Sequence, residues 1–364
     1  MVHDYLNQRG GAERVFAHIA AAYPQAPIFT SIYNERELVD LVPAHRVRTS
    51  FLQRLPGHDR YFRALAPLYP LAFERLDLDP YDLVISSTTA WAKGVVTRGD
   101  AVHLCYINTV SRFAFDYERY VGGFGLARLA RPLVQGLVAW DKRAAQRPTQ
   151  FIANSQNVAD RVLRYYGRES QVLPCPVDVD RFTLGPGAGN YFVLVSRLLS
   201  YKNIDVAIAG CALAGVPLHI LGSGPAQASL RALAAGTQTT FHGYVDDAAV
   251  NRVVGNARAA ILPGSEDFGL VPLEAAAAGR PTIALGAGGA LETIIEGETG
   301  EFFREPNAAS LAQALRAFDP ARYRPARLRE HAETFAPQRF IERLSAIVDR
   351  ALERREQSVG RSLR

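Results

Sequence analysis

Long apolar runs are missing from this sequence, and so is a recognisable export signal. No stretch reaches the roughly twenty apolar residues of a membrane-spanning helix, and no charged-then-apolar segment opens the chain. Cysteine is scarce. Cys105, Cys175 and Cys211 are widely spaced and match no metal-binding or redox pattern, so we expect buried free thiols. These absences predict a cytoplasmic protein.

Size and charge leave several classes of partner open. A chain of 364 residues is long enough for about two domains. The formal net charge is +5, and the excess is mostly arginine. Such a charge suits anionic lipid, nucleic acid or phosphorylated ligands. Nucleic acid is the least favoured of these, because basic and acidic residues are interleaved outside Arg119–Arg168.

The first half of the chain alternates strand-like runs with helical patterns, which predicts a doubly wound parallel sheet. The opening strand, before Asn7, is short, and we expect that upstream strand residues are missing from this version of the chain. A helix is expected from Ala12 to about Ala22. The later strands are expected at Ile28–Tyr33, Val47–Phe51, Leu83–Ser86 and Val102–Ile107.

A segment rich in glycine and proline, Pro186–Asn190, predicts the domain boundary. We therefore expect an N-terminal domain over residues 1–185, a second domain over 186–336 and a C-terminal helix over 337–364. Residues from Glu353 onward are charged and lack apolar periodicity, so that tail is expected to fray.

The segment Phe51–Phe73 mixes arginine with aromatic residues and has two interpretations. It can lie in a membrane interface, or it can pack on its own sheet with the arginines outside. Further basic residues in the following helices favour contact with anionic lipid.

The most informative stretch is Pro263–Pro281. An apolar strand runs into a glycine-bearing turn, and Leu270–Ala278 then reads as a helix. Free N–H groups at the start of that helix suit a phosphate, whereas Glu266 and Glu274 suit hydroxyl groups. A ligand with phosphates in the middle and hydroxyls at both ends, a nucleotide sugar, fits this pattern. The alternative is a strand–loop–helix unit with two solvated glutamates.

Glu266 and Glu274, with Phe268-Gly-Leu between them, resemble the Glu-x7-Glu signature of the retaining glycosyltransferases of family 4. Ser196–Asn203 resembles a second motif of that family. The resemblance covers almost the whole chain. It implies an α/β fold of GT-B architecture, in which two Rossmann-like domains face each other across a cleft and the last helix returns to the first domain.

The resemblance also implies roles for individual residues. Arg197 and Lys202 would hold the diphosphate, Glu266 the sugar hydroxyls and Glu274 the ribose hydroxyls. Further donor contacts would come from the glycine loop of the first domain and from turns of the second, at Gly10, Gly11, Gly222, Phe268, Gly269 and Leu270.

Residues of the first domain are candidates for the acceptor side. Lys93 follows a predicted strand end, where ligands of open α/β sheets bind, although a capped helix start explains the neighbouring serines and threonines equally well. Arg112 matches a family motif. In that motif a histidine that reaches the transferred sugar is replaced here by Asn108, which forms hydrogen bonds but cannot titrate.

The family resemblance implies a retaining, metal-independent transferase that needs no cofactor, because the nucleotide sugar is its substrate. Overall likeness points to transfer of a hexose, with mannose from GDP-mannose as the best guess. The acceptor would be a lipid-linked saccharide or polysaccharide at the inner face of the membrane, as in O-antigen or exopolysaccharide assembly. The alternative, suggested by Asn108 and the short first strand, is a nucleotide-sugar-binding protein that has lost transfer.

Overall fold

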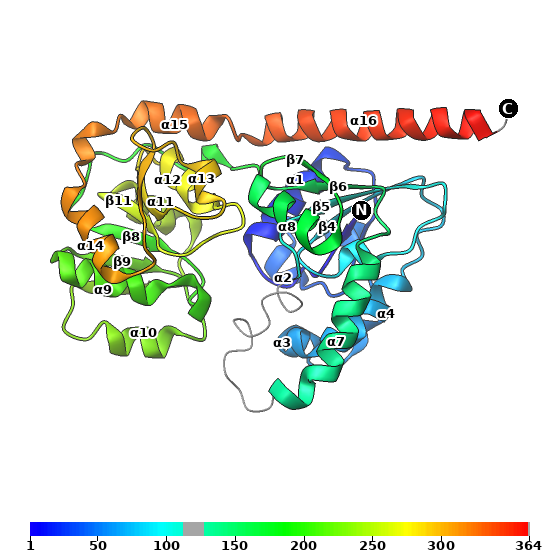
Figure 1. The fold of residues 1–364 in the computed structure, drawn as a ribbon, viewed down its shortest axis with the longest axis horizontal. Helices are drawn as coiled ribbons and strands as arrows, with labels where there is room; N and C mark the ends of the chain where they lie inside the picture. The colour runs from blue at the N-terminus through cyan, green and yellow to red at the C-terminus, as the bar shows by residue number, and fades with distance from the viewer. Residues whose placement is uncertain (112–126, 363–364) are drawn as a thin grey trace. The chain divides into compact units, whose positions relative to one another are not determined.

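The computed structural model describes residues 1–111 and 127–362, and it divides into two units (Figure 1). The first comprises Met1–Pro174 together with Phe340–Arg364, and the second comprises Cys175–Arg339. No helix in the described part of the chain is both long and apolar enough to cross a bilayer. The three cysteines are buried and form no disulfide with one another, as predicted.

The first unit contains a seven-stranded parallel sheet in the order β3-β2-β1-β4-β5-β6-β7. This confirms the doubly wound sheet expected from the alternating pattern. Its strands are β1 (Val2–His3), β2 (Ile28–Thr30), β3 (Val47–Thr49), β4 (Leu83–Thr88), β5 (Val102–Ile107), β6 (Gln150–Ala153) and β7 (Ser170–Val172). Its longer helices are α1 (Gly11–Ala22), α7 (Ala127–Ala144), α8 (Gln156–Tyr166) and α16 (Pro337–Ser362), which begins in the second unit.

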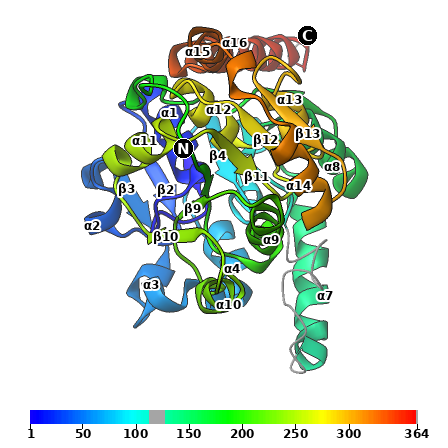
Figure 2. The same ribbon diagram turned by 90° about the vertical axis from the view of Figure 1, so that its left-hand side faces the viewer.

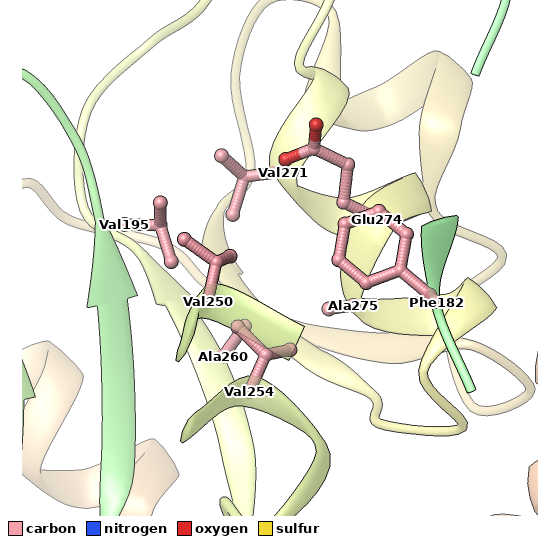
Figure 3. Close-up of a pocket in the computed structure, with 8 residues that line it drawn as sticks. All are labelled: Phe182, Val195, Val250, Val254, Ala260, Val271, Glu274 and Ala275. Carbon is pink, nitrogen blue, oxygen red and sulfur yellow. The ribbon is translucent and has the colours of Figure 1, made fainter. Parts of the chain in front are cut away.

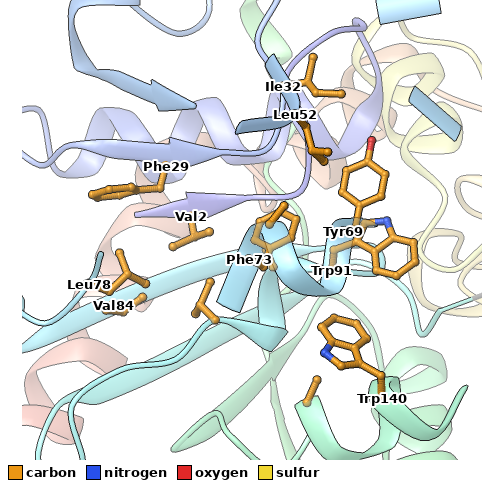
Figure 4. Close-up of a cluster of buried hydrophobic side chains, with 14 of the residues drawn as sticks. Val2, Phe29, Ile32, Leu52, Tyr69, Phe73, Leu78, Val84, Trp91 and Trp140 are labelled. Atoms are coloured by element: carbon orange, nitrogen blue, oxygen red, sulfur yellow. The ribbon is translucent and has the colours of Figure 1, made fainter. Parts of the chain in front are cut away.

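The basic-aromatic segment, Phe51–Phe73, folds into short helices, and its residues Tyr69 and Phe73 enter the core (Figure 4). Tyr69 stacks on Trp91 with ring centroids 5.0 Å apart, and Phe73 is fully buried. The arginines of the segment are exposed. The helices are α3 (His58–Tyr61) and α4 (Tyr69–Glu74), with 3-10 turns at Phe51–Arg54 and Phe62–Leu68. The segment therefore packs on its own sheet, as one of the two interpretations expected.

The second unit contains a six-stranded parallel sheet in the order β10-β9-β8-β11-β12-β13. Helix α9 packs beside α14, as Figures 1 and 2 show, and α12 packs against α15. The strands are β8 (Phe192–Val195), β9 (Leu218–Leu221), β10 (Thr239–Gly243), β11 (Ala259–Leu262), β12 (Thr282–Leu285) and β13 (Gly300–Phe303). The helices are α9 (Ile204–Ala214), α10 (Gln227–Leu233), α11 (Asp247–Gly255), α12 (Leu270–Ala277), α13 (Ala290–Thr293), α14 (Ala308–Ala317) and α15 (Pro325–Glu333).

The division between the units falls at Pro174–Cys175 and not at the predicted 185/186. The segment before the glycine-rich stretch belongs to the second unit because its backbone is bonded there. The N–H of Val177 donates to the carbonyl of Phe335 at 2.9 Å, and the N–H of Gly185 donates to that of Ala278 at 3.1 Å.

Helix α16 packs on the first unit from Phe340 onward. Phe340 meets the ring of Tyr106 edge-on, with centroids 5.7 Å apart. Arg355 donates to Asp82 at 2.9 Å and to Asp100 at 3.0 Å. A frayed tail is expected from Glu353, whereas helix α16 continues to Ser362, and Arg355 ties the helix to the unit.

Candidate functional site

The candidate site lies where the strand order of the second sheet reverses. Strands β9 and β10 follow β8 on one side, whereas β11 begins the other half of the sheet, so the chain leaves β8 and β11 in opposite directions. Ligands of open parallel sheets bind beyond the carboxyl ends of two such strands. The loops that start at Ser196 and Pro263 flank this point, and they carry most of the residues expected to bind a donor.

Lys202 and Glu266 join these two loops directly. The ammonium Nζ lies 2.6 Å from each carboxylate oxygen of Glu266. The two side chains are 15% and 20% exposed, so the pair is partly shielded from water. Asn203, which follows Lys202, adopts a left-handed conformation (φ 53°) and donates to the carbonyl of Pro263 at 3.4 Å. These contacts hold the two loops together.

The turn after Glu266 ends in helix α12. Gly269 occupies the N-cap with φ 93°, a conformation that side chains rarely tolerate. Phe268 is buried and packs edge-on against Phe335 at 6.0 Å between ring centroids. The carbonyl of Glu266 accepts a hydrogen bond from the N–H of Gly289 at 2.9 Å. The turn is thus fixed on both sides, and it leads from Glu266 into the positive end of α12.

Glu274 lies one turn inside α12 and lines a small hollow of the second unit (Figure 3). The figure shows its carboxylate near Val271, while the rest of the lining is apolar. The other lining residues are Phe182, Val195, Val250, Val254, Ala260 and Ala275. A single carboxylate beside an apolar wall can accept hydrogen bonds from a hydroxyl-bearing ligand.

Arg197 and Gly222, two further residues expected to bind the nucleotide sugar, differ in whether their polar groups are available to a ligand. Arg197 is exposed and forms no ion pair with any residue that the structure describes, so its guanidinium is available to a ligand. The N–H of Gly222 instead donates to the carbonyl of Gly243 at 2.7 Å. A Cβ atom at Gly222 would lie 2.0 Å from the carbonyl oxygen of Ser196. Gly222 therefore allows two loops to pack closely, and its own N–H is used within the protein and not turned toward a nucleotide sugar.

The corresponding reversal in the first sheet, between β1 and β4, is filled by the chain itself. Asp4 follows β1 and is 1% exposed. Its carboxylate accepts six hydrogen bonds from residues 88–92 after β4. Sequence reasoning missed this residue, because its importance depends on β1 and β4 being neighbours.

Lys93 is not available to an acceptor substrate, which corrects the expectation from the sequence. Its side chain is 1% exposed, and Nζ lies 2.5 Å from Oδ1 of Asp141, which is itself fully buried. The hydroxyl of Ser111 donates to the Asp141 carboxylate at 2.5 Å, and the hydroxyl of Tyr166 donates to the same carboxylate at 2.8 Å. Burial by itself would lower the pKa of Lys93, but the Asp141 carboxylate together with Tyr166 and Asp4 outweighs burial and raises that pKa above its ordinary value. Lys93 belongs to a buried polar network.

The remaining candidates of the first unit are spread over several elements. Asn108 follows β5 and donates from Nδ2 to the hydroxyl of Ser87 at 3.1 Å, so it lies at the carboxyl edge of the sheet. Gly10 is the N-cap of α1, and Gly11 is its first residue. Arg112 lies outside the described residues.

Comparison with known proteins identifies both units. Residues 9–181 match the Glycosyltransferase Family 4 model, and residues 178–335 match the Glycosyl transferases group 1 model. The computed structure resembles sucrose-phosphate synthase from Thermosynechococcus elongatus with a TM-score of 0.70 and 19% identity, covering 97% of this chain and 99% of that one. It resembles Anabaena Alr3699/HepE in complex with UDP with a TM-score of 0.69 and 18% identity, covering 96% and 100%.

These findings define a class of protein. The chain is built from two Rossmann-like domains of glycosyltransferase type, with GT-B glycosyltransferases as structural neighbours. This confirms the expected fold class of two Rossmann-like α/β domains.

Sequence relatives carry related names. D-inositol 3-phosphate glycosyltransferase of Geodermatophilus obscurus is 28% identical over 258 residues, covering 61% of this chain and 57% of the relative. D-rhamnosyltransferase WbpZ of Pseudomonas aeruginosa is 30% identical over 212 residues, covering 52% and 53%. Phosphatidyl-myo-inositol mannosyltransferase of Mycobacterium leprae is 27% identical over 274 residues, covering 61% and 73%. The chain thus matches only about half the length of the first two.

Proposed function

We propose that this protein is a retaining glycosyltransferase that moves a hexose from a nucleotide-diphosphate sugar to an acceptor. The observation that carries the proposal is the Lys202–Glu266 pair, which joins the loops after the two strands at the reversal of the second sheet, with Glu266 in the turn that leads into α12. It places cationic and anionic groups side by side in one small site. Cations and helix N–H groups suit phosphate, and carboxylates suit hydroxyls.

Each group then has a chemical task. Arg197 and Lys202 hold the diphosphate and stabilise the negative charge that develops on the departing nucleotide. Glu266 accepts hydrogen bonds from the sugar, and Glu274 accepts them from the ribose. Phe268, Gly269 and Leu270 add backbone N–H groups. The two cations take the place of a metal ion, and the leaving phosphate acts as the base in a front-side attack, so no side chain serves as nucleophile.

We propose GDP-mannose as the donor. It is supported by the name of the Mycobacterium leprae relative, a mannosyltransferase. Other similar proteins are named as glycogen synthases, and one solved structure contains UDP-glucose, so UDP and ADP sugars belong in the same test.

We further propose a lipid-linked saccharide as the acceptor, reached from the inner face of the membrane. Exposed apolar side chains of the basic-aromatic segment support this proposal, with Tyr61 55% exposed and Leu71 41% exposed. The guanidinium of Arg60 lies 5.4 Å from the ring centroid of Tyr61. Aromatic and aliphatic side chains flanked by exposed arginines match an anionic membrane interface.

A binding protein without transfer activity is the second candidate. It is favoured by Asn108, which stands in place of the family histidine and bonds to Ser87 at 3.1 Å. Such a protein would bind the donor but would not turn it over when acceptor is supplied.

The test combines calorimetry with thermal unfolding of the protein in the presence of GDP, UDP, ADP and their sugars. A ligand at about 100 times its dissociation constant stabilises the protein by about 2.7 kcal/mol. One nucleotide should do so in the wild type, and its effect should be lost in Lys202→Ala and Glu274→Ala. Lys142→Ala is the matched control, because Lys142 is an exposed lysine of α7 in the other unit.

The outcomes separate the candidates. If none of these nucleotides stabilises the wild type, the second unit holds no donor and the glycosyltransferase proposal falls. Binding of one nucleotide sugar, followed by sugar transfer to a lipid-linked saccharide, supports the enzyme. Tight binding without transfer supports the second candidate.

A further inference from the structure

The ion pair between Lys202 and Glu266 places two demands on one ammonium group. Nζ lies 2.6 Å from both carboxylate oxygens, so one ammonium group contacts both oxygens of the Glu266 carboxylate. At 15% and 20% exposure, water only partly replaces a lost partner. A diphosphate at the strand reversal would require the same ammonium group, and a carboxylate beside it would repel the phosphates.

The main chains of both partners are held, since the N–H of Lys202 donates to the carbonyl of Leu199 at 3.1 Å, but the side chain of Lys202 is the longer one. Glu266 is held by its main chain, whose carbonyl accepts from the N–H of Gly289 and which pairs with Gly288 in a parallel bridge. Lys202 carries its charge on a flexible four-carbon stem. When a phosphate draws the ammonium away, the ion pair between Lys202 and the Glu266 carboxylate is broken.

We propose that Glu266 makes the site discriminate between an intact nucleotide sugar and the free nucleoside diphosphate. The hydroxyls of a bound sugar replace the ammonium as donors to the carboxylate, so the intact donor can draw Lys202 to its phosphates at little cost. A free nucleoside diphosphate brings no such hydroxyls, so it breaks the Lys202–Glu266 ion pair without replacing that contact. Glu266 thus competes with the product for Lys202 and favours product release.

This inference rests on the proposed function, and it makes an opposite prediction for the two ligands. In Glu266→Gln the competing charge is gone, while the amide can still bond to sugar hydroxyls. The free nucleoside diphosphate should bind about threefold to tenfold more tightly, as expected when a partly exposed competing ion pair is removed. The corresponding nucleotide sugar should bind no more tightly than before.

The experiment is calorimetric titration of the wild type and Glu266→Gln with GDP and GDP-mannose, and with UDP and UDP-glucose. Inhibition of transfer by the free nucleoside diphosphate gives a second readout, and it should become stronger in the variant. Glu296→Gln is the matched control, because it removes a carboxylate that pairs with Arg304 at 3.1 Å in the same unit. It should leave both affinities unchanged.

Two further variants keep the test decisive. In the Lys202→Met background, Glu266→Gln should no longer tighten binding of the nucleoside diphosphate, since the cation it competes for is gone. Glu266→Asp moves the negative charge away from Lys202 by the length of one methylene, so the free nucleoside diphosphate should bind somewhat more tightly than to the wild type. This variant replaces Glu266→Gln in the test if the glutamine variant unfolds.

The inference is overturned if folded Glu266→Gln binds the nucleoside diphosphate no better than the wild type, or if the gain persists without Lys202. Either result leaves the proposed function intact as long as the wild type binds a nucleotide. If the wild type binds none, both proposals fall together.

Discussion

Replacing Asp4 by asparagine should weaken the first unit strongly, although the change removes only one charge and keeps the shape of the side chain. Oδ1 accepts from the hydroxyl of Thr88 and the N–H groups of residues 91 and 92, at 2.6 to 2.9 Å. Oδ2 accepts from the N–H and hydroxyl of Thr89 and the N–H of Ala90, at 2.6 to 2.8 Å. In asparagine, one of these oxygens becomes an NH₂ group that cannot accept.

The size of the loss follows from the groups left without an acceptor. The hydroxyl of Thr89 can rotate, and the N–H of Ala90 keeps a hydrogen bond to the Thr88 hydroxyl at 3.1 Å, but the N–H of Thr89 loses its acceptor. A buried donor without a partner costs about 1–3 kcal/mol, and this is the loss that we expect. Because domains are stable by only about 5–15 kcal/mol, Asp4→Asn should remain folded but unfold at clearly lower urea concentration.

Tryptophan fluorescence measures this loss selectively. The chain has two tryptophans, Trp91 and Trp140, and both lie in the core of the first unit. Asp77→Asn, at an exposed position of the same unit, is the control and should change the free energy of unfolding by less than about 0.5 kcal/mol. A loss below about 1 kcal/mol for Asp4→Asn would refute the view that its carboxylate holds the turn after β4.

Three other changes test separate features. Asp141→Asn removes the carboxylate that pairs with the buried Lys93 ammonium, and it should lower the free energy of unfolding in urea by about 3–5 kcal/mol. An equal loss in the exposed control Asp77→Asn would contradict this prediction. Burial lowers the pKa of His103 from its ordinary 6.5 to about 3. The stability that the neutral imidazole contributes is therefore fully present above pH 6.5 and is lost as the pH falls toward 3. His103→Gln should reduce this fall in the free energy of unfolding with acidification. Gly222→Ala forces a Cβ atom against a backbone oxygen and should abolish calorimetric binding of nucleotide, whereas Gly286→Ala, with only ordinary contacts, should not.

Local patterns were enough to predict many elements. The helix expected from Ala12 to Ala22 is α1 (Gly11–Ala22). The strand, turn and helix of Pro263–Pro281 follow the predicted order. These features depend on neighbouring residues, so apolar periodicity, capping and glycine suffice to predict them.

The environments of single residues depended on contacts that no local pattern reports. Lys93 was expected to meet an acceptor, yet Asp141, distant in sequence, draws its ammonium into the core. Asp4 gained its role only because β1 and β4 are neighbours in the sheet.

The same distinction applies to the candidate site. Sequence motifs singled out Lys202 and Glu266 separately and predicted their chemical type. Only the folded sheet, which places β8 beside β11, paired their charges across the two loops. Strand order is set by the burial of apolar faces over a whole domain, and this long-range packing determines which polar groups meet.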